Sequence, residues 1–171
     1  MPTEEALRRH LHAQGAAEPY YAVVIPLVRE SEGYSLLVEV RAQGIPQAGD
    51  PCFPGGRIEA GETPAMAASR ELEEELALRV PPEEFLGRLT TIRNFRGRWI
   101  DAFVCTLTPE EADGARSNPD EVAALLRVPL SFLLSHPDAR EFPFAGHTIW
   151  GMTAILIQRF CSLWREITGE E

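Results

Sequence analysis

Residues 56–78 read GRIEAGETPAMAASRELEEELAL, and this stretch is the most informative part of the chain. In its second half, Glu71, Glu74 and Glu75 are spaced i, i+3 and i+4, so a helix places all three carboxylates on one face. Like charges at these spacings repel, and each pair costs roughly 0.2–0.5 kcal/mol. We therefore expect a cation to bind at this face. The alternative is a solvated acidic face, which is the usual fate of a charge run.

The opposite face of the same segment explains why it forms a helix. Small and aliphatic residues recur there at steps of three and four positions: Ala65, Ala68, Leu72 and Leu76. At the start, the Thr63 side chain can accept a hydrogen bond from a free backbone amide, and Pro64 fits the first turn without loss of a helical hydrogen bond. The sequence therefore predicts a helix that begins at Thr63 and has one packed face and one polar face.

A glycine-rich turn precedes the helix, since residues 53–56 read FPGG. Two residues without side chains let backbone carbonyls approach a bound ion or ligand closely. Turn and helix together resemble the signature of the Nudix hydrolase family, G-x5-E-x7-R-E-U-x-E-E-x-G-U, in which U is aliphatic. The chain matches this signature at Gly56, Glu62, Arg70, Glu71, Leu72, Glu74, Glu75 and Leu78. The one departure is Ala77, which stands where the family usually has the glycine that ends the helix in a left-handed conformation.

The resemblance implies the fold of the whole chain. Nudix domains are α/β/α sandwiches in the α/β class, with a mixed sheet between helices. A length of 171 residues, of which 44% are hydrophobic and 25% charged, fits one domain with one sizeable core. We therefore expect a single Nudix hydrolase domain over residues 1–171, with residues 1–18 as an N-terminal helical extension.

Local patterns predict the remaining elements. Runs rich in β-branched and aromatic residues indicate strands at residues 20–28, 34–40, 86–93 and 99–107, with a weaker candidate at 122–128. Polar turns at residues 29–33 and 94–97 predict that the first two strands form a hairpin and that the next two form another. Helical patterns cover residues 3–14, 131–135 and 151–167, and Pro81 and Pro82 are expected to stop helical structure.

Further stretches are similar to the coenzyme A pyrophosphatase subgroup of the family. They are residues 41–42, 49, 53–56, 118–122, 128–134 and 147–154. The chain departs from the subgroup between Arg41 and Gly49, where the spacing is one residue short and Pro46 stands near the place of a second arginine. A proline has no fork of N–H donors with which to bind phosphate.

This similarity implies a metal-dependent hydrolase that cleaves the diphosphate bond of coenzyme A or a derivative to 3',5'-ADP and 4'-phosphopantetheine. The competing enzymatic hypothesis is cleavage of ADP-ribose, dinucleotides or other nucleoside diphosphate derivatives. The non-enzymatic hypothesis is a nucleotide-binding sensor domain. Such a domain is expected to lose a carboxylate from the signature, and this chain retains them all. The sequence leaves the oligomeric state open, and a homodimer is one option.

The roles of the family carry over residue by residue. For Mg2+ or Mn2+, the resemblance implies that the ligands are the carbonyl of Gly56 and the carboxylates of Glu71, Glu74 and Glu75. Magnesium prefers such oxygen donors. The implied catalytic residues are Arg70, Glu74, Glu75 and Glu121, and the implied substrate-binding residues are Arg41, Phe53 and Gly55.

Several of these roles have a plainer alternative. Arg70 lies one position off the acidic face, so we expect it to orient carboxylates rather than to contact substrate. Glu121 is the candidate general base, and an ordinary loop acid beside Asp120 is the equal alternative. Arg41 could contact phosphate or simply flank a strand as an exposed charge. Glu59 and Glu62 are second-tier candidates for the site and are as readily structural.

Composition argues against several other classes of protein. The net charge of −10 disfavours nucleic acid as a partner, because a polyanion would be repelled by most of the surface. No apolar run approaches the roughly 20 residues that span a bilayer, and residues 1–12 lack the apolar segment of a secretory signal, so we expect a cytoplasmic protein without membrane contact. The three cysteines contain no CxxC pair, which predicts neither a disulfide framework nor a zinc site. Cys52 is expected to pack as an ordinary core residue, and Trp150 likewise.

Overall fold

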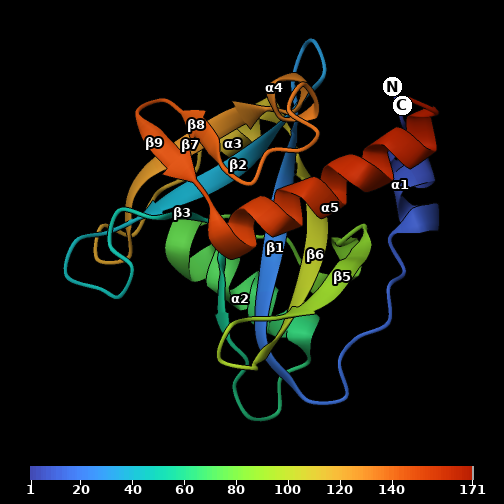
Figure 1. Cartoon of the computed structure of the whole chain (residues 1–171). Coiled ribbons are helices and arrows are strands. Elements are labelled where there is room, and N and C mark those ends of the chain that lie inside the picture. Colours follow the sequence, from blue (N-terminus) through green and yellow to red (C-terminus); the bar gives the residue numbers. More distant parts are fainter. Residues whose placement is uncertain (171) are drawn as a thin grey trace.

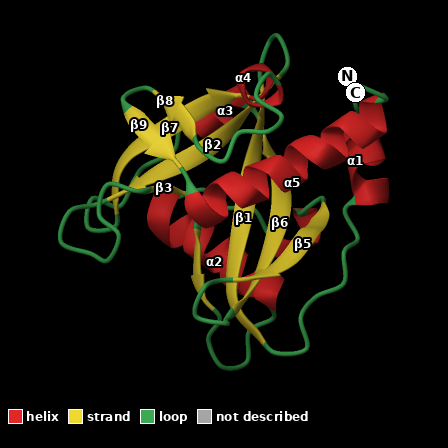
Figure 2. Cartoon of the chain, in the orientation of Figure 1, coloured by secondary structure: helices red, strands yellow, loops and turns green. Residues whose placement is uncertain are grey.

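A mixed sheet lies between two long helices in the computed structural model, which describes residues 1–170. Helix α2 (Pro64–Leu76) covers one face of the sheet and helix α5 (Gly151–Thr168) covers the other (Figure 1 and Figure 2). The expected α/β/α arrangement is therefore confirmed.

The bounds of the elements are as follows. The seven strands of the main sheet are β1 (Pro19–Arg29), β2 (Tyr34–Arg41), β3 (Pro51–Cys52), β4 (Gly55–Arg57), β5 (Gly87–Arg93), β6 (Trp99–Leu107) and β7 (Val122–Pro129). A separate two-stranded hairpin contains β8 (Phe142–Phe144) and β9 (His147–Ile149). The short helical elements are α1 (Glu4–His10), the 3-10 turn η1 (Pro82–Glu84), α3 (Pro109–Asp113) and α4 (Leu130–Leu134).

Strand β1 organises the sheet. It runs parallel to β6 along one edge, and its other edge pairs antiparallel with two different strands. The end of β1, at residues 27–29, pairs with β2, whereas residues 21–23 pair with β4. Strand β2 therefore diverges from β1 and continues between β3 and β7. The divergence leaves room for residues 53–56 beside β1, where the amide of Val24 donates to the carbonyl of Pro54 at 2.9 Å.

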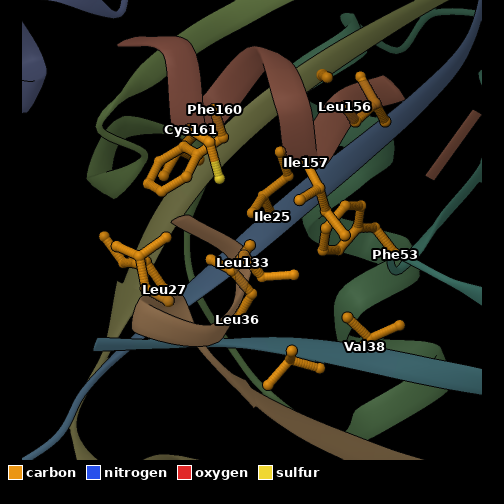
Figure 3. Close-up of a cluster of buried hydrophobic side chains, with 14 of the residues drawn as sticks. Ile25, Leu27, Leu36, Val38, Phe53, Leu133, Leu156, Ile157, Phe160 and Cys161 are labelled. Carbon is orange, nitrogen blue, oxygen red and sulfur yellow. The ribbon is translucent and has the colours of Figure 1, made fainter. Parts of the chain in front are cut away.

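Apolar side chains fill both faces of the sheet. On the α5 face, residues of β1 and β2 such as Ile25 and Leu36 pack with Ile157 and Phe160 of the helix (Figure 3). On the α2 face, Val24 of β1 packs with Leu72 of α2, together with Leu76 and Phe103. Alternate residues of one strand thus point to opposite layers, as the pleat of a strand requires.

Most of the predicted strands and helices are confirmed. The strand pairs β1–β2 and β5–β6 are antiparallel hairpins at the expected positions, and β7 corresponds to the weaker candidate. Helices α4 and α5 match their predictions to within one residue. No helix within residues 1–170 combines the length and the apolar composition needed to cross a membrane.

The N-terminal helix is shorter than predicted. It ends at His10 instead of near Gln14, because the chain turns to run along β5: His12 bridges Arg88, and the amide of Ala13 donates to the carbonyl of Arg88 at 3.1 Å. Leu7 and Leu11 are buried in the cluster on the α5 face. The N-terminal segment therefore contributes to the core of the domain.

Two expectations about prolines and tryptophan are wrong. Helix α2 ends at Leu76, before the two prolines, and Pro82 instead begins η1, where its fixed φ and missing N–H are tolerated. Trp150 is 51% exposed instead of buried, and its indole Nε1 donates to Asp50 Oδ1 at 3.4 Å. The sequence also gave no prediction for β3, β4, α3, β8 and β9, all of which are at most five residues long.

Helix α2 begins and ends as its sequence indicates. The Thr63 hydroxyl accepts a hydrogen bond from the amide of Met66 at 3.2 Å, and Pro64 is the first helical residue. The packed face is centred on Ala67, Ala68, Leu72 and Leu76, while Ala65 is only partly buried, so the stripe is rotated slightly from the predicted one. At the other end, Ala77 adopts the left-handed conformation with φ 56° and ψ 29°.

We expect the substitution Ala77→Gly to stabilise the protein by about 1 kcal/mol, because a left-handed conformation costs an L-residue roughly that amount and glycine nothing comparable. Urea unfolding measures the change. Ala123→Gly is the matched control: this exposed alanine lies within β7, where glycine is expected to destabilise by about 0.5–1 kcal/mol. Equal effects of the two substitutions would contradict the assignment of strain to Ala77.

Candidate metal and diphosphate site

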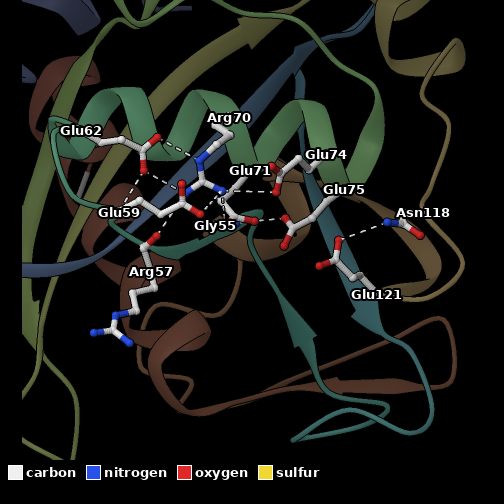
Figure 4. A network of polar contacts seen from close by, with 10 residues as sticks. All are labelled: Gly55, Arg57, Glu59, Glu62, Arg70, Glu71, Glu74, Glu75, Asn118 and Glu121. Carbon is white, nitrogen blue, oxygen red and sulfur yellow. Dashed lines mark hydrogen bonds and ion pairs between the residues drawn. The ribbon is translucent and has the colours of Figure 1, made fainter.

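The predicted carboxylates gather where the second half of α2 faces the turn at residues 53–56 (Figure 4). Glu71 and Glu75 are largely buried, while half of the Glu74 side chain is exposed. Gly56 lies directly against this face, and a Cβ atom at that position would be 2.4 Å from Glu71 Oε1. A side chain at position 56 would therefore displace the Glu71 carboxylate from its place beside this backbone. The sequence correctly predicted that these residues lie together.

Arg70 connects the acidic residues to one another. Its guanidinium donates to Glu62 at 2.9 and 3.0 Å, to Glu71 at 3.0 Å and to Glu74 at 3.3 Å, and it also reaches the carbonyl of Arg57 at 3.1 Å. Glu59 is more distant, with 3.8 Å between its Oε1 and Arg70 Nη1. The hydrogen bond from Arg70 lowers the pKa of Glu62. Arg70 thus holds carboxylates in place, and it does not line the neighbouring cavity.

Glu75 is the most buried acid of the helix. Its Oε2 accepts a hydrogen bond from the amide of Gly55 at 3.1 Å. Burial raises its pKa, and the nearby carboxyl of Glu39 raises it further. Glu39 lies on β2 and is 3% exposed. The sequence reasoning missed Glu39, because a single acid within a strand gives no signal of burial.

Glu121 lies at the same cluster, just before β7. Its Oε2 accepts a hydrogen bond from Asn118 Nδ2 at 3.4 Å, and the amide of Asn118 donates to the carbonyl of Glu75 at 2.8 Å (Figure 4). The negative charge of Glu121 contributes to the raised pKa of Glu71, after the larger effect of burial. The loop before β7 therefore brings a further acid to the face of α2.

A cavity of about 530 Å³ opens beside the acidic cluster. Its lining includes all three residues predicted to bind substrate, together with two residues from the turn between β5 and β6: Arg41, Phe53, Gly55, Phe95 and Arg96. Phe53 is 4% exposed, so most of its ring belongs to the core. Arg41 donates through Nε to the carbonyl of Pro46 at 2.8 Å, which fixes the side chain at the cavity wall.

Phe95 was not predicted as a site residue. It is 86% exposed at the tip of the turn, and the guanidinium of Arg96 lies 5.6 Å from its ring centroid. An exposed aromatic residue in a predicted turn was the signal that could have identified it. A larger cavity of about 600 Å³ lies along α5 next to Ile155 and Arg159, but Gly55 and Gly56, which lie against the acidic face of α2, line only the smaller of these two cavities. We therefore place the candidate site at the smaller cavity.

The residues of the site fit a divalent ion. The carboxylates that gather here are oxygen donors, and the buried acids Glu39 and Glu75 lie close enough to each other to interact. Mg2+ and Mn2+ suit carboxylate and carbonyl oxygens. Within residues 1–170, however, no three acidic, histidine or cysteine side chains already converge on one point, since Arg70 holds Glu71 and the Gly55 amide holds Glu75. Coordination of one ion by three of these carboxylates would therefore require side-chain rotation.

The buried pair predicts how stability depends on pH. Burial raises the pKa of Glu39 to about 7, compared with 4.5 in an unfolded chain. Between these values the folded state holds a proton that the unfolded state lacks, so the free energy of unfolding falls as the pH rises, by up to about 1.4 kcal/mol per pH unit. We expect the stability of metal-free protein to fall from pH 5 to pH 8 relative to the Glu39→Gln variant. Thermal unfolding in EDTA measures this difference, and a difference that is constant with pH would contradict it.

Comparisons with known proteins agree with the fold and the signature. The family model described as NUDIX domain matches residues 19–144. Two bacterial relatives, each named uncharacterized Nudix hydrolase NudL, are 28% identical (Escherichia coli strain K12) and 30% identical (Citrobacter koseri) to this chain. Both alignments cover 90% of this chain and 87% of the relative.

Solved structures show the same fold at low sequence identity. The NUDIX domain of Shewanella oneidensis NrtR, complexed with ADP ribose, has a TM-score of 0.62 at 18% identity, with 86% of this chain and 88% of that chain covered. An Ap4A hydrolase from C. elegans has a TM-score of 0.54 at 17% identity, with 87% and 96% covered. These similarities support the fold and not a particular substrate.

Proposed function

Because this chain belongs to the Nudix hydrolase family, which acts on diphosphate bonds of nucleoside diphosphate derivatives, we propose that it hydrolyses coenzyme A or a derivative to 3',5'-ADP and 4'-phosphopantetheine. One observation carries the hydrolytic part of this proposal. The buried carboxylates of α2 lie against the Gly55–Gly56 backbone at the edge of a cavity that two arginines line.

The proposed roles follow the contacts of each residue. Glu71, Glu74, Glu75 and the carbonyl of Gly56 would hold Mg2+ or Mn2+. When bound, the ion would supply Lewis-acid polarisation of the diphosphate and of water. Arg70 keeps Glu71 and Glu74 oriented through its hydrogen bonds at 3.0 and 3.3 Å. Arg70 is thus a positioning residue.

The attacking water needs a group that accepts its proton. Glu121 is our candidate, because its carboxylate lies at the cluster and makes one weak hydrogen bond, of 3.4 Å, to Asn118. Glu74 is the second candidate, because about half of its side chain is exposed to water. A carboxylate acts as a general base when it lies within hydrogen-bond reach of the attacking water.

The substrate is expected to occupy the cavity. Arg41 and Arg96 line its wall and can donate to phosphate oxygens, while Phe95 offers a ring face to the base. The resemblance of residues 41–42, 49 and 53–56 to the coenzyme A subgroup supports coenzyme A as the first choice. The second choice is ADP-ribose or a dinucleotide, since structurally similar proteins include one bound to ADP ribose and an Ap4A hydrolase.

A substrate panel tests the proposal. Purified protein with Mg2+ or Mn2+ is incubated with coenzyme A, acetyl-coenzyme A, ADP-ribose, NADH and Ap4A, and the products are separated by chromatography. We expect 3',5'-ADP from coenzyme A at the highest kcat/KM. Faster turnover of ADP-ribose or Ap4A would move the assignment to the second choice. Nucleotide binding without any turnover would favour the sensor hypothesis.

Phe95 provides a separate prediction about substrate binding. Stacking of a base on an aromatic ring contributes roughly 1–3 kcal/mol, so we expect Phe95→Ala to raise KM about tenfold with little change in kcat. Phe95→Tyr is the matched control, because it keeps the ring and should retain the parent KM. Steady-state kinetics on the best substrate of the panel measures both variants. An unchanged KM for the alanine variant would show that the base binds elsewhere.

A further inference from the structure

Glu39 is a buried acid that the family signature does not include. It lies on β2, where Leu36 and Val38 point into the cluster on the α5 face and Leu37 points into the cluster on the α2 face. Alternation along the strand therefore directs Glu39 towards α2. Its side chain is 3% exposed and lies within interaction distance of Glu75.

The hydrogen bonds of Glu39 are incomplete. Its Oε2 lies 3.9 Å from Cys52 Sγ, which is a long contact to a weak donor. Its Oε1 is buried and has no hydrogen-bond partner in the part of the chain that the structure describes. A buried carboxylate without partners is costly unless a cation or several donors compensate it.

Charged groups around Glu39 also affect how well its negative charge is compensated. The charges of Glu121 and Glu71 act unfavourably on the Glu39 carboxylate, whereas a proton on the neighbouring Glu75 carboxyl favours it. Arg41 also has a favourable effect, but its Nε is already bound to the carbonyl of Pro46. The acids Glu39, Glu71, Glu75 and Glu121, from β2, α2 and the loop before β7, are thus close enough to act on one another. A divalent ion would balance them.

We propose that Glu39 is an additional ligand of the divalent ion, contributed by β2 beside Glu75. Its free Oε1 is the proposed ligating atom, while Oε2 has the long contact to the Cys52 thiol. This inference rests on the proposed metal-dependent function, because the ion is the one that Glu71 and Glu75 bind. It adds a ligand from outside the helix, and it accounts for the presence of an acid at a buried position in a strand.

The test is Mn2+ binding by the Glu39→Gln variant, without nucleotide. Titration calorimetry should show at least a tenfold lower affinity than the parent, because loss of a supporting or direct ligand typically costs 10- to 100-fold. Thermal unfolding gives an independent result. In EDTA, the variant should melt at a higher temperature than the parent, because the buried like-charge pair is removed, and saturating Mn2+ should raise its Tm by less.

The controls separate ligation from a merely structural role. Glu73→Gln removes one charge from the exposed part of α2, where Glu73 is paired with Arg79, and it should retain the parent Mn2+ affinity. A structural role for Glu39 predicts the reverse of our expectation: a lower Tm in EDTA with an Mn2+ affinity within twofold of the parent. That result would overturn the proposal.

A second variant covers the case in which Glu39→Gln does not fold. Glu39→Asp keeps the charge but withdraws the carboxylate by one methylene group, so direct ligation predicts a weaker affinity for Mn2+. An unchanged affinity would rule out ligation. If the parent binds Mn2+ yet hydrolyses no diphosphate, the proposed function fails. The Mn2+ affinities of the variants then still decide whether Glu39 is a ligand. If the parent binds no Mn2+, both fail.

Discussion

Replacing Glu75 with glutamine is expected to lower kcat/KM for the best diphosphate substrate about a thousandfold. Glu75 is the most buried carboxylate of α2, and its Oε2 is fixed by the amide of Gly55 at 3.1 Å. A metal ion supplies several kcal/mol of charge stabilisation in the transition state, and about 4 kcal/mol corresponds to three powers of ten in rate. Glutamine keeps the shape and the bond to Gly55 but removes the charge that binds the ion.

The design separates lost catalysis from lost folding. Because Glu75 faces Glu39, the glutamine variant should be at least as stable as the parent in EDTA. Glu73→Gln is the matched control on the same helix, since Glu73 is exposed and contacts Arg79 rather than the site. It should retain the parent kcat/KM. A folded Glu75→Gln variant that hydrolyses substrate at the parent rate would refute the assignment of the metal site.

The parts of the fold that the sequence predicted well depend on local chemistry. Helix α2 was predictable because its cap at Thr63, its first-turn proline and its apolar stripe all lie within the segment itself. The two hairpins were predictable because each pair of apolar runs flanks a polar turn. The site residues of α2 followed from the spacing of three glutamates. In each case neighbouring residues carry the information.

The parts that were missed depend on contacts between distant segments. Strands β3 and β4 are two and three residues long and exist only because β1 and β2 diverge. Glu39 appears in the sequence as one polar residue within an apolar run, and only the folded arrangement, which brings it beside Glu75 of α2, shows that it is buried. Trp150 was predicted in the core on the basis of residue type, but it caps α5 at the surface.

The role of residues 1–18 illustrates the same limit. The sequence suggested an extension to the domain, and the family model begins only at residue 19. In the structure, these residues are held by Asp101 of β6, which is fully buried. Its Oδ1 accepts hydrogen bonds from Thr91 Oγ1 at 2.9 Å and from the amide of Ala16 at 3.4 Å. Its Oδ2 lies 3.4 Å from Arg88 Nη2.

Asp101→Ala is therefore expected to destabilise the protein by about 3 kcal/mol, because it leaves the Arg88 guanidinium without its buried partner and the Ala16 amide without an acceptor. Arg88 cannot readily turn away, since it packs 4.9 Å from the centroid of the Phe103 ring. Asp101→Asn should cost less, because its Oδ1 still accepts both hydrogen bonds. Urea unfolding measures both variants against Asp113→Ala, which breaks an exposed ion pair and should cost under about 1 kcal/mol. If Asp101→Ala costs no more than Asp113→Ala, this network does not anchor the N-terminal segment.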